Sequence, residues 1–321
     1  MHDSGTTPKG TEATPLTGRR NICIVMNSGS GKKDTSQIPD RIAAAFGRAD
    51  VSYRLDIVKS GADITDTAQR AVDEGFSTIV AAGGDGTICA VASVVRNSGR
   101  TMGIIPLGTF NYFARSLDIP VEVEDAVDVI VAGSERHVPI ATINDRVFLN
   151  NSSLGAYPEI LKNREEIYAR WGRSRVAAYW SVFKTLVMLR RPLKLQIVTQ
   201  GETRDVTTPL VFAVNNAFQL EQIGLAGREE VAQGKLVLFI APNSGRLGML
   251  RHALALIAGN ATEDRNFEIM AADHIRIETR RGARMVACDG ERTRMKIPFE
   301  LQVHPRELCV TVPNARKEGV R

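Results

Sequence analysis

Three glycine-rich segments of the sequence could hold a phosphate group, and each follows a short apolar run. They are residues 27–31 (NSGSG), 83–87 (GGDGT) and 106–109 (PLGT). Glycine lets a backbone approach a ligand closely, and the N–H groups at the start of a helix attract anions. Because loops at the carboxyl ends of parallel strands meet at one edge of a sheet, the three segments are predicted to line one crevice.

Two common phosphate-binding patterns do not explain these segments. A Walker A loop needs a glycine five residues before its Gly-Lys pair, but Met26 stands there ahead of Gly31 and Lys32. A G-x-G-x-x-G pattern begins at Gly84, but Cys89 occupies the place of the third glycine. The predicted phosphate contacts therefore follow neither scheme.

The segment 83–87 carries the strongest single signal. Its glycines allow a tight turn beneath a phosphate, Asp85 offers a carboxylate to a metal ion or a hydroxyl, and Thr87 can cap the following helix. An ordinary strand–helix turn is the structural alternative, since Gly-Gly and Asp-Gly are common in turns.

The segment after it adds two polar candidates. Thr109 and Asn111 could meet a nucleotide, and Arg115 could be either a structural or a phosphate-facing cation. The aromatic residues Phe110 and Phe113 are predicted to belong to the core.

A further carboxylate stands in the second half of the chain. Asp289-Gly290-Glu291 follows a predicted strand at 285–288, and Asp-Gly taken alone is most often a hairpin turn. The functional interpretation makes Glu291 a general base that reaches across from a second domain.

Alternating strands and helices must position the first three segments. Strands are predicted at 22–26, 51–58, 78–82 and 103–105, and helices at 38–46, 64–72, 87–96, 111–117 and 123–131. This alternation predicts a parallel, doubly wound α/β sheet.

The pattern changes after about residue 138. Strand-like runs then follow one another, at 147–150, 193–199, 210–214, 235–240, 274–279, 285–288 and 308–312, with hairpin turns expected at 200–202 and 280–282 and a helix at 247–258. A β-sandwich-like second domain is predicted. The predicted organisation is a disordered tail at 1–20, an α/β domain at 21–140, a β-rich domain at 141–314 and a tail at 315–321.

Taken in order, these motifs resemble those of the diacylglycerol kinase catalytic-domain family of lipid kinases, which includes sphingosine and ceramide kinases. The matching segments are 27–31, 83–87, 106–115 (PLGTFNYFAR) and 289–291 (DGE). The resemblance implies an ATP-binding α/β domain, a C-terminal β-sandwich and an active site in a cleft between them. It assigns the catalytic base to Glu291. With the two polar candidates above, the nucleotide-binding residues are expected to be Asn27, Ser28, Gly29, Ser30, Gly31, Gly83, Gly84, Asp85, Gly86, Thr87, Thr109 and Asn111.

Three positions depart from the family pattern. Ser28 replaces the usual proline, while Phe110 and Tyr112 replace a small residue and an aspartate. The stretch 233–237 (QGKLV) has no acidic neighbour, so the structural magnesium site that some bacterial members carry there is not expected.

The expected activity is transfer of the γ-phosphoryl group of ATP to a hydroxyl of a diacylglycerol-like or sphingoid lipid. ATP and Mg²⁺ are the expected cofactors; Asp85 and Glu291 are the expected catalytic residues, with Asp85 directed at the catalytic Mg²⁺ or the acceptor. A NAD kinase-like phosphotransferase is one alternative, and a non-catalytic regulator that binds nucleotide or lipid is another. Neither the lipid nor the oligomeric state can be read from these motifs.

The net charge of +5 is concentrated in one segment. Residues 161–194 contain nine Lys or Arg against two Glu, together with five aromatic residues. Such a composition suits an anionic membrane surface, and equally a solvated helix with its aromatics packed inward; no nucleic-acid motif accompanies the charge. With four scattered cysteines and no apolar run of roughly 18 residues, the expected location is cytoplasmic, at the membrane periphery.

Overall fold

The computed structural model describes residues 14–15, 21–29, 36–155, 192–243, 267–280 and 282–314. The chain forms two compact units: Met1–Pro139 with Pro305–Arg321, and Ile140–His304. The sequence pattern placed residues 141–314 together, whereas the last part of strand β17 (Phe299–Val312) belongs to the first unit. The reason is that Cys309 and Val310 pair in parallel with a strand of the first unit's sheet.

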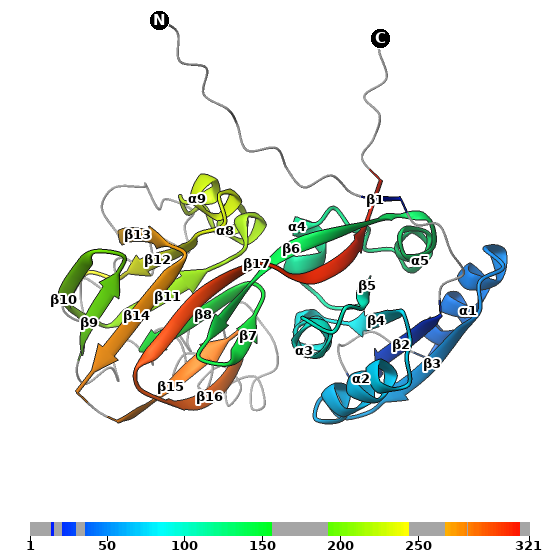
Figure 1. Ribbon diagram of the computed structural model, residues 1–321, viewed down its shortest axis with the longest axis horizontal. Coiled ribbons are helices and arrows are strands. Elements are labelled where there is room, and N and C mark those ends of the chain that lie inside the picture. The colour runs from blue at the N-terminus through cyan, green and yellow to red at the C-terminus, as the bar shows by residue number, and fades with distance from the viewer. Residues whose placement is uncertain are drawn as a thin grey trace, which may run out of the picture. The chain divides into compact units, whose positions relative to one another are not determined.

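The first unit is built on a parallel sheet with helices on both faces (Figure 1). Its strands lie in the order β3 (Tyr53–Val58), β2 (Ile22–Asn27), β4 (Thr78–Gly83), β5 (Thr101–Pro106) and β17. Helices α1 (Ile38–Arg48) and α5 (Val123–Ala132) pack together on one face, and α2 (Asp63–Asp73) and α3 (Asp85–Val95) on the other. The predicted doubly wound α/β architecture is confirmed.

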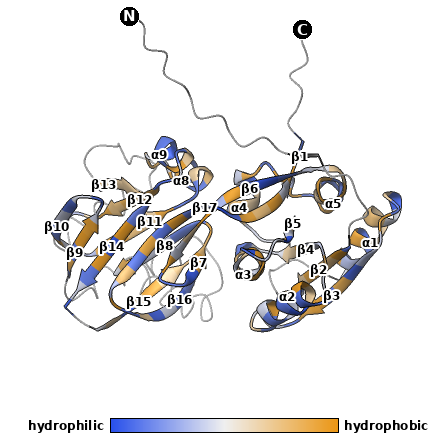
Figure 2. Ribbon diagram, viewed as in Figure 1, coloured by the Kyte–Doolittle hydropathy of each residue, from blue (hydrophilic) through white to orange (hydrophobic). Residues whose placement is uncertain are grey.

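The sequence of these elements explains their burial. Every residue of β2, β4 and β5 is buried, as expected of parallel strands covered on both faces, and Figure 2 shows β2 as hydrophobic along most of its length. Helix α1 buries Ile42, Ala45 and Phe46, which recur at helical spacing. Across the contact between α1 and α5, hydrogen bonds from Arg41 lower the pKa of Glu124 to about 2.

Two short elements complete this unit as described. Helix α4 (Tyr112–Ser116) follows β5, and strand β1 (Thr14–Pro15) pairs with Ser134 and Glu135 of β6 (Ser134–Ile143). Part of the predicted disordered tail therefore takes part in a sheet. The rest of that tail, and the predicted tail at 315–321, lie outside the described residues.

The second unit contains two antiparallel sheets. The strands of the first sheet lie in the order β10 (Glu202–Thr208), β9 (Leu193–Thr199), β14 (His274–Thr279) and β17. The strands of the second sheet lie in the order β13 (Glu268–Ala272), β12 (Leu236–Ile240), β11 (Leu210–Val214), β8 (Asn151–Gly155), β15 (Ala283–Cys288) and β16 (Glu291–Lys296). Side chains of both sheets, such as Ile197, Val211 and Phe299, share one core. The predicted β-sandwich-like domain is confirmed.

Helices cover the outer face of the second of these sheets. Val231 and Leu220, from α9 (Arg228–Ala232) and α8 (Ala217–Ile223), pack against Val214, Val237 and Phe239. The predicted helix at 247–258 and nearly all of the basic segment at 161–194 lie outside the described residues.

One of the two predicted hairpin turns is wrong. Residues 200–202 join β9 to β10 as expected. Residues 280–282, in contrast, lead from β14 in one sheet to β15 in the other, because the chain crosses the sandwich there. A crossing loop and a hairpin turn use the same polar and glycine residues, so composition does not separate them.

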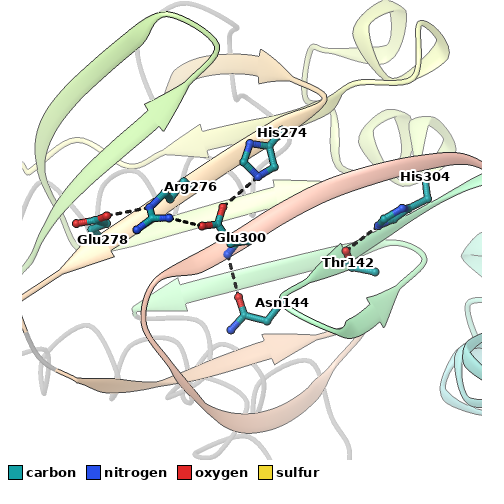
Figure 3. Close-up of polar contacts among 7 residues, drawn as sticks. All are labelled: Thr142, Asn144, His274, Arg276, Glu278, Glu300 and His304. Atoms are coloured by element: carbon teal, nitrogen blue, oxygen red, sulfur yellow. Dashed lines mark hydrogen bonds and ion pairs between the residues drawn. The ribbon is translucent and has the colours of Figure 1, made fainter.

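An exposed polar network fixes the end of β6 against β17 (Figure 3). The Asn144 N–H donates to the Glu300 carbonyl at 2.7 Å, and the Glu300 N–H donates to Asn144 Oδ1 at 2.9 Å. The Glu300 carboxylate also lies 2.8 Å from Arg276 and 3.0 Å from His274. An exposed ion pair such as that of Arg276 with Glu300 contributes about 0–1 kcal/mol, so this network specifies register more than it adds stability.

A substitution at Gly103 of β5 tests the packing of α5 on the parallel sheet. A Cβ at this position would lie 2.8 Å from Val80 Cγ2 and 3.1 Å from Ile130 Cγ1. We expect Gly103→Val to lower the free energy of unfolding by about 1–3 kcal/mol, because the added carbons overfill this contact. Urea denaturation measures the change.

Gly47 provides the matched control. It lies in α1, and a Cβ added to it would meet no atom of the surrounding structure within 4 Å, so Gly47→Ala should stabilise the protein by about 0.5–1 kcal/mol. Unchanged stability of Gly103→Val would contradict the close contact between β5 and α5.

Candidate active site

The three glycine-rich loops follow neighbouring strands of the parallel sheet. The described parts of these loops come after β2, β4 and β5, which lie side by side. After β2 the chain leads to α1 on one face, and after β4 it leads to α3 on the other. In open α/β sheets, ligands bind at such a switch point. Ser30 and Gly31 lie outside the described residues.

Asn27 links the first loop to the second. Its side chain is buried at the end of β2, and Nδ2 donates to Thr87 Oγ1 at 3.2 Å. Its Oδ1 accepts the Gly29 N–H at 3.0 Å, which closes the turn. A Cβ on Gly29 would lie 2.6 Å from the Lys59 carbonyl oxygen, so this turn requires glycine. The Ser28 N–H donates to the Val58 carbonyl at 2.9 Å and ties the loop to β3.

The second loop forms the start of α3. Gly84 is the N-cap residue and makes no side-chain cap, and the helix begins at Asp85. The prediction that Thr87 caps this helix is therefore wrong, because Thr87 lies inside the first turn and its hydroxyl accepts from Asn27. A Cβ on Gly83 would lie 2.4 Å from Thr87 Oγ1. The first-turn N–H groups of a helix have no intrahelical acceptor and favour anions.

Asp85 connects the second loop to the third. Its Oδ2 accepts the Asn111 N–H at 3.0 Å, and its Oδ1 accepts the Phe113 N–H at 3.4 Å. The Asn111 side chain in turn accepts the Gly108 N–H at 2.9 Å and donates to the Gly108 carbonyl at 3.0 Å. A Cβ on Gly108 would lie 2.7 Å from Gly84 Cα, so two glycines allow the loops to touch.

The chemistry of this donor set suits a metal ion that arrives with a nucleotide. Asp85 is the acidic residue of the three segments, and a carboxylate oxygen can accept more than one contact. Mg²⁺ on phosphates needs only one or two protein carboxylates. Within the described ranges, no group of three or more His, Cys, Asp or Glu side chains could hold a metal by itself.

The aromatic residues of the third loop differ from each other in burial. Phe113 is 4% exposed, as predicted for a core residue. Phe110 is 60% exposed, so its assignment to the core is wrong. Asn111 between them adopts the left-handed region (φ +52°) and turns its own side chain inward. Thr109, the other predicted nucleotide residue of this loop, is exposed.

The DGE motif of the second unit forms a hairpin turn. Asp289 (φ +46°) and Gly290 (φ +89°) make a two-residue connection from β15 to β16. The Asp289 carboxylate accepts the N–H groups of Leu149, Asn150 and Asn151 at 2.7–3.0 Å. The sequence motif did not reveal this role, because an Asp-Gly turn gives no sign of a partner about 140 positions away.

Glu291 follows this turn as the first residue of β16. Its side chain is 65% exposed, and Arg146 donates to its Oε2 at 2.6 Å. Arg146 also donates to Thr293 Oγ1 at 2.6 Å, which fixes the guanidinium and with it the carboxylate. Arg146 is the first residue of β7 (Arg146–Phe148), and no motif of the sequence singled it out. Glu291 belongs to the second unit and the three loops belong to the first.

A buried polar cluster supports the segment that Asp289 holds. Asn216 donates to Asn150 Oδ1 at 2.7 Å, and Asn151 donates to Gln219 Oε1 at 3.0 Å. Next to it, burial raises the pKa of the Cys288 thiol to about 11. A raised pKa favours the neutral thiol, which is a weak nucleophile.

Two family models match this chain. Residues 21–143 match the model of the diacylglycerol kinase catalytic domain, and residues 163–312 match that of the YegS C-terminal NAD kinase beta sandwich-like domain. Residues 21–143 therefore resemble the catalytic domain of the diacylglycerol kinase family. The resemblance inferred from the four motifs is confirmed.

Relatives named diacylglycerol kinase resemble this chain to different extents. One from Bacillus subtilis is 25% identical over 301 residues, which are 92% of this chain and 97% of the relative. Those from Staphylococcus carnosus and Staphylococcus aureus are 30% and 32% identical, over 44% of this chain. This chain spans about half the length of these staphylococcal relatives, 47% and 46%.

Solved structures support the fold. A crystal structure of a diacylglycerol kinase from Bacillus anthracis has a TM-score of 0.63 and 19% identity, and another structure from that organism has a TM-score of 0.69 and 22% identity. Each comparison covers 92% of this chain and 98% of the other. In the part of the chain that the structure describes, no helix is long and apolar enough to cross a membrane.

Asp289→Asn tests the anchor in the second unit. The amide nitrogen of asparagine cannot accept a hydrogen bond, so at least one N–H among residues 149–151 loses its partner. We expect the free energy of unfolding to fall by about 1–3 kcal/mol, with faster hydrogen exchange at these three amides. Asp145→Asn, an exposed position between β6 and β7, is the control and should change neither quantity.

Asp85→Asn tests the link between the second and third loops. Hydrogen exchange at the Asn111 and Phe113 amides should accelerate, because the substituted side chain retains a single acceptor oxygen for two donors. Asp118→Asn is the matched control: it is exposed nearby and has a positive φ that asparagine tolerates. Equal protection in Asp85→Asn and the native chain would show that the loops are held by other contacts.

Proposed function

We propose that this protein is an ATP-dependent lipid kinase, which transfers the γ-phosphoryl group of ATP to a hydroxyl of a diacylglycerol-like or sphingoid lipid. The observation that carries the proposal is the linked set of loops at one edge of the parallel sheet, in a chain that matches the model of the diacylglycerol kinase catalytic domain. Phosphoryl transfer depends mainly on positioning and charge stabilisation, which such rigid loops supply.

Backbone N–H groups are proposed to hold the phosphates of ATP. In the segment 27–31, the Ser28 and Gly29 N–H groups already donate to Val58 and Asn27 and shape the turn. The proposed donors therefore come mainly from the segment 83–87, where the first turn of α3 begins at Asp85 and the helix terminus favours negative charge. Thr109 and Asn111 are proposed to complete the nucleotide site. The contacts among Asn27, Thr87 and Asp85 support this assignment, because they fix the three loops before a ligand binds.

Asp85 is proposed to hold the Mg²⁺ that accompanies ATP, directly or through water. Bound there, the ion would neutralise charge on the transferred phosphoryl group. The same carboxylate also holds the third loop, since it accepts the N–H groups of Asn111 and Phe113.

Glu291 is proposed to act as general base. The oxygen of the lipid hydroxyl attacks the γ-phosphorus, the bond to the bridging oxygen of ADP breaks, and the hydroxyl proton passes to the Glu291 carboxylate. The ion pair with Arg146 supports this role, because it orients the carboxylate. Exposure of the side chain leaves it accessible to a substrate.

The protein is further proposed to act at the surface of the cytoplasmic membrane. The support is the basic and aromatic composition of residues 161–194, since cationic segments with aromatic residues bind anionic lipid surfaces. A NAD kinase-like activity remains the second candidate, because the model matched by residues 163–312 is described as NAD kinase beta sandwich-like.

Incubation of the purified protein with radiolabelled ATP, Mg²⁺ and a total lipid extract tests the proposal. A labelled phospholipid is the expected product, and its chromatographic identification names the substrate. A parallel reaction with NAD tests the second candidate. Labelled NADP without labelled lipid would replace the proposed function, and ATP binding without either product would indicate a regulator.

The variant Glu291→Gln tests the role of the base. We expect kcat for lipid phosphorylation to fall by about 10²–10⁴-fold, while the KM for ATP and the thermal stability stay close to those of the native protein. Glu229→Gln, an exposed glutamate of α9, is the control and should retain full activity. Full lipid-kinase activity in a folded Glu291→Gln variant would refute the assignment.

A further inference from the structure

Phe110 exposes an aromatic ring on the third loop. Of the large hydrophobic side chains in the described ranges, it has the largest exposed fraction, 60%. A single exposed apolar side chain is ordinary on a protein surface. This one differs because the backbone around it is held rigidly.

The ring of Phe110 is stacked on that of Tyr112. The ring centroids lie 5.3 Å apart, and the planes are within 3° of parallel. Asn111 between the two aromatics is 4% exposed, and its side chain both accepts from and donates to Gly108. The two rings therefore form an aromatic surface whose position is fixed by the stacking and by the contacts of Asn111.

This surface is attached directly to the phosphate loops. The Asn111 N–H donates to Asp85 in the first turn of α3, and Gly108 lies against Gly84. Phe110 is therefore the neighbour of Asn111, whose N–H binds the loop that is proposed to hold phosphates. A nucleotide held there by its phosphates extends its sugar and base away from the first turn of α3.

We propose that Phe110, supported from behind by Tyr112, stacks on the purine base of the bound nucleotide. This inference rests on the proposed nucleotide site and deepens it. Tyr112 covers one face of the Phe110 ring, and the other face offers an aromatic plane on which the planar base can stack. Stacking of a base on an aromatic side chain strengthens binding by about tenfold or more.

A lipid surface is the competing occupant. The acidic residues that follow the loop do not decide between the two, because Arg41 pairs with Glu122 and Glu124 and Arg115 precedes them. The contacts of the third loop with Asp85 and Gly84 favour the nucleotide, because they attach Phe110 to the loop that is proposed to bind phosphates.

Calorimetric titration of the full chain with ATP and with inorganic tripolyphosphate, each with Mg²⁺, separates base from phosphate binding. Phe110→Ala should raise the Kd for ATP about tenfold or more and leave the Kd for tripolyphosphate unchanged. Phe110→Trp should retain ATP affinity, whereas Phe110→Leu, which is apolar but not aromatic, should lose most of it. Ile223→Ala removes another exposed apolar side chain, in α8, and should alter neither Kd.

Three results would overturn the inference: an unchanged Kd for ATP in Phe110→Ala, an equal loss for both ligands, or full ATP affinity in Phe110→Leu. Loss of binding to anionic vesicles with ATP affinity intact would assign Phe110 to the membrane instead. The proposed activity is tested separately. Stacking without any lipid phosphorylation would overturn the lipid-kinase proposal alone, and a native chain that binds neither ligand would overturn both.

Discussion

A carboxylate that accepts backbone N–H groups from a distant loop organises each of the two candidate sites. In the first unit, Asp85 accepts from Asn111 and Phe113, 26 and 28 residues further along the chain. In the second unit, Asp289 accepts from three consecutive residues at 149–151. Hydrogen bonds to an ionised acceptor are shorter and stronger than neutral ones. The same side chains that make these motifs recognisable therefore also fix the shape of the loops around them, so their removal would alter geometry as well as chemistry.

The rigid loops rest on a sheet that contributes little chemistry of its own. Strands β2, β4 and β5 are buried throughout, and α1 and α3 leave on opposite faces. This geometry opens a space at the carboxyl ends of the strands. Glycine is needed at Gly108, where a Cβ would lie 2.7 Å from Gly84 Cα, and at Gly83, because Thr87 lies against it. Close approach of backbones, rather than flexibility, explains the glycines of this site.

The sequence predicted the elements well where burial alone determines them. Continuous apolar runs identified β2 and β4, and helical spacing identified α1. It failed where the partner of a residue lies far along the chain. Composition did not distinguish the crossing loop at 280–282 from a hairpin, and Phe110 was assigned to the core because hydrophobicity does not report which way a loop residue points. The candidate site residues were found by motif, but the contacts that position them, such as Arg146 with Glu291 and Asp289 with residues 149–151, arise only from tertiary structure.

Strand β17 has a consequence for the synthesis of the protein on the ribosome. Its first half belongs to the second unit, and Cys309 and Val310 near its end pair with β5 of the first unit. This edge of β5 therefore cannot gain its β17 partner until Cys309 and Val310, about 200 residues further along the chain, have been synthesised. Exposed strand edges are sites of aberrant pairing, and domains commonly fold in the order in which they are translated. Here the N-terminal unit is begun first but completed last, after the sandwich that interrupts it.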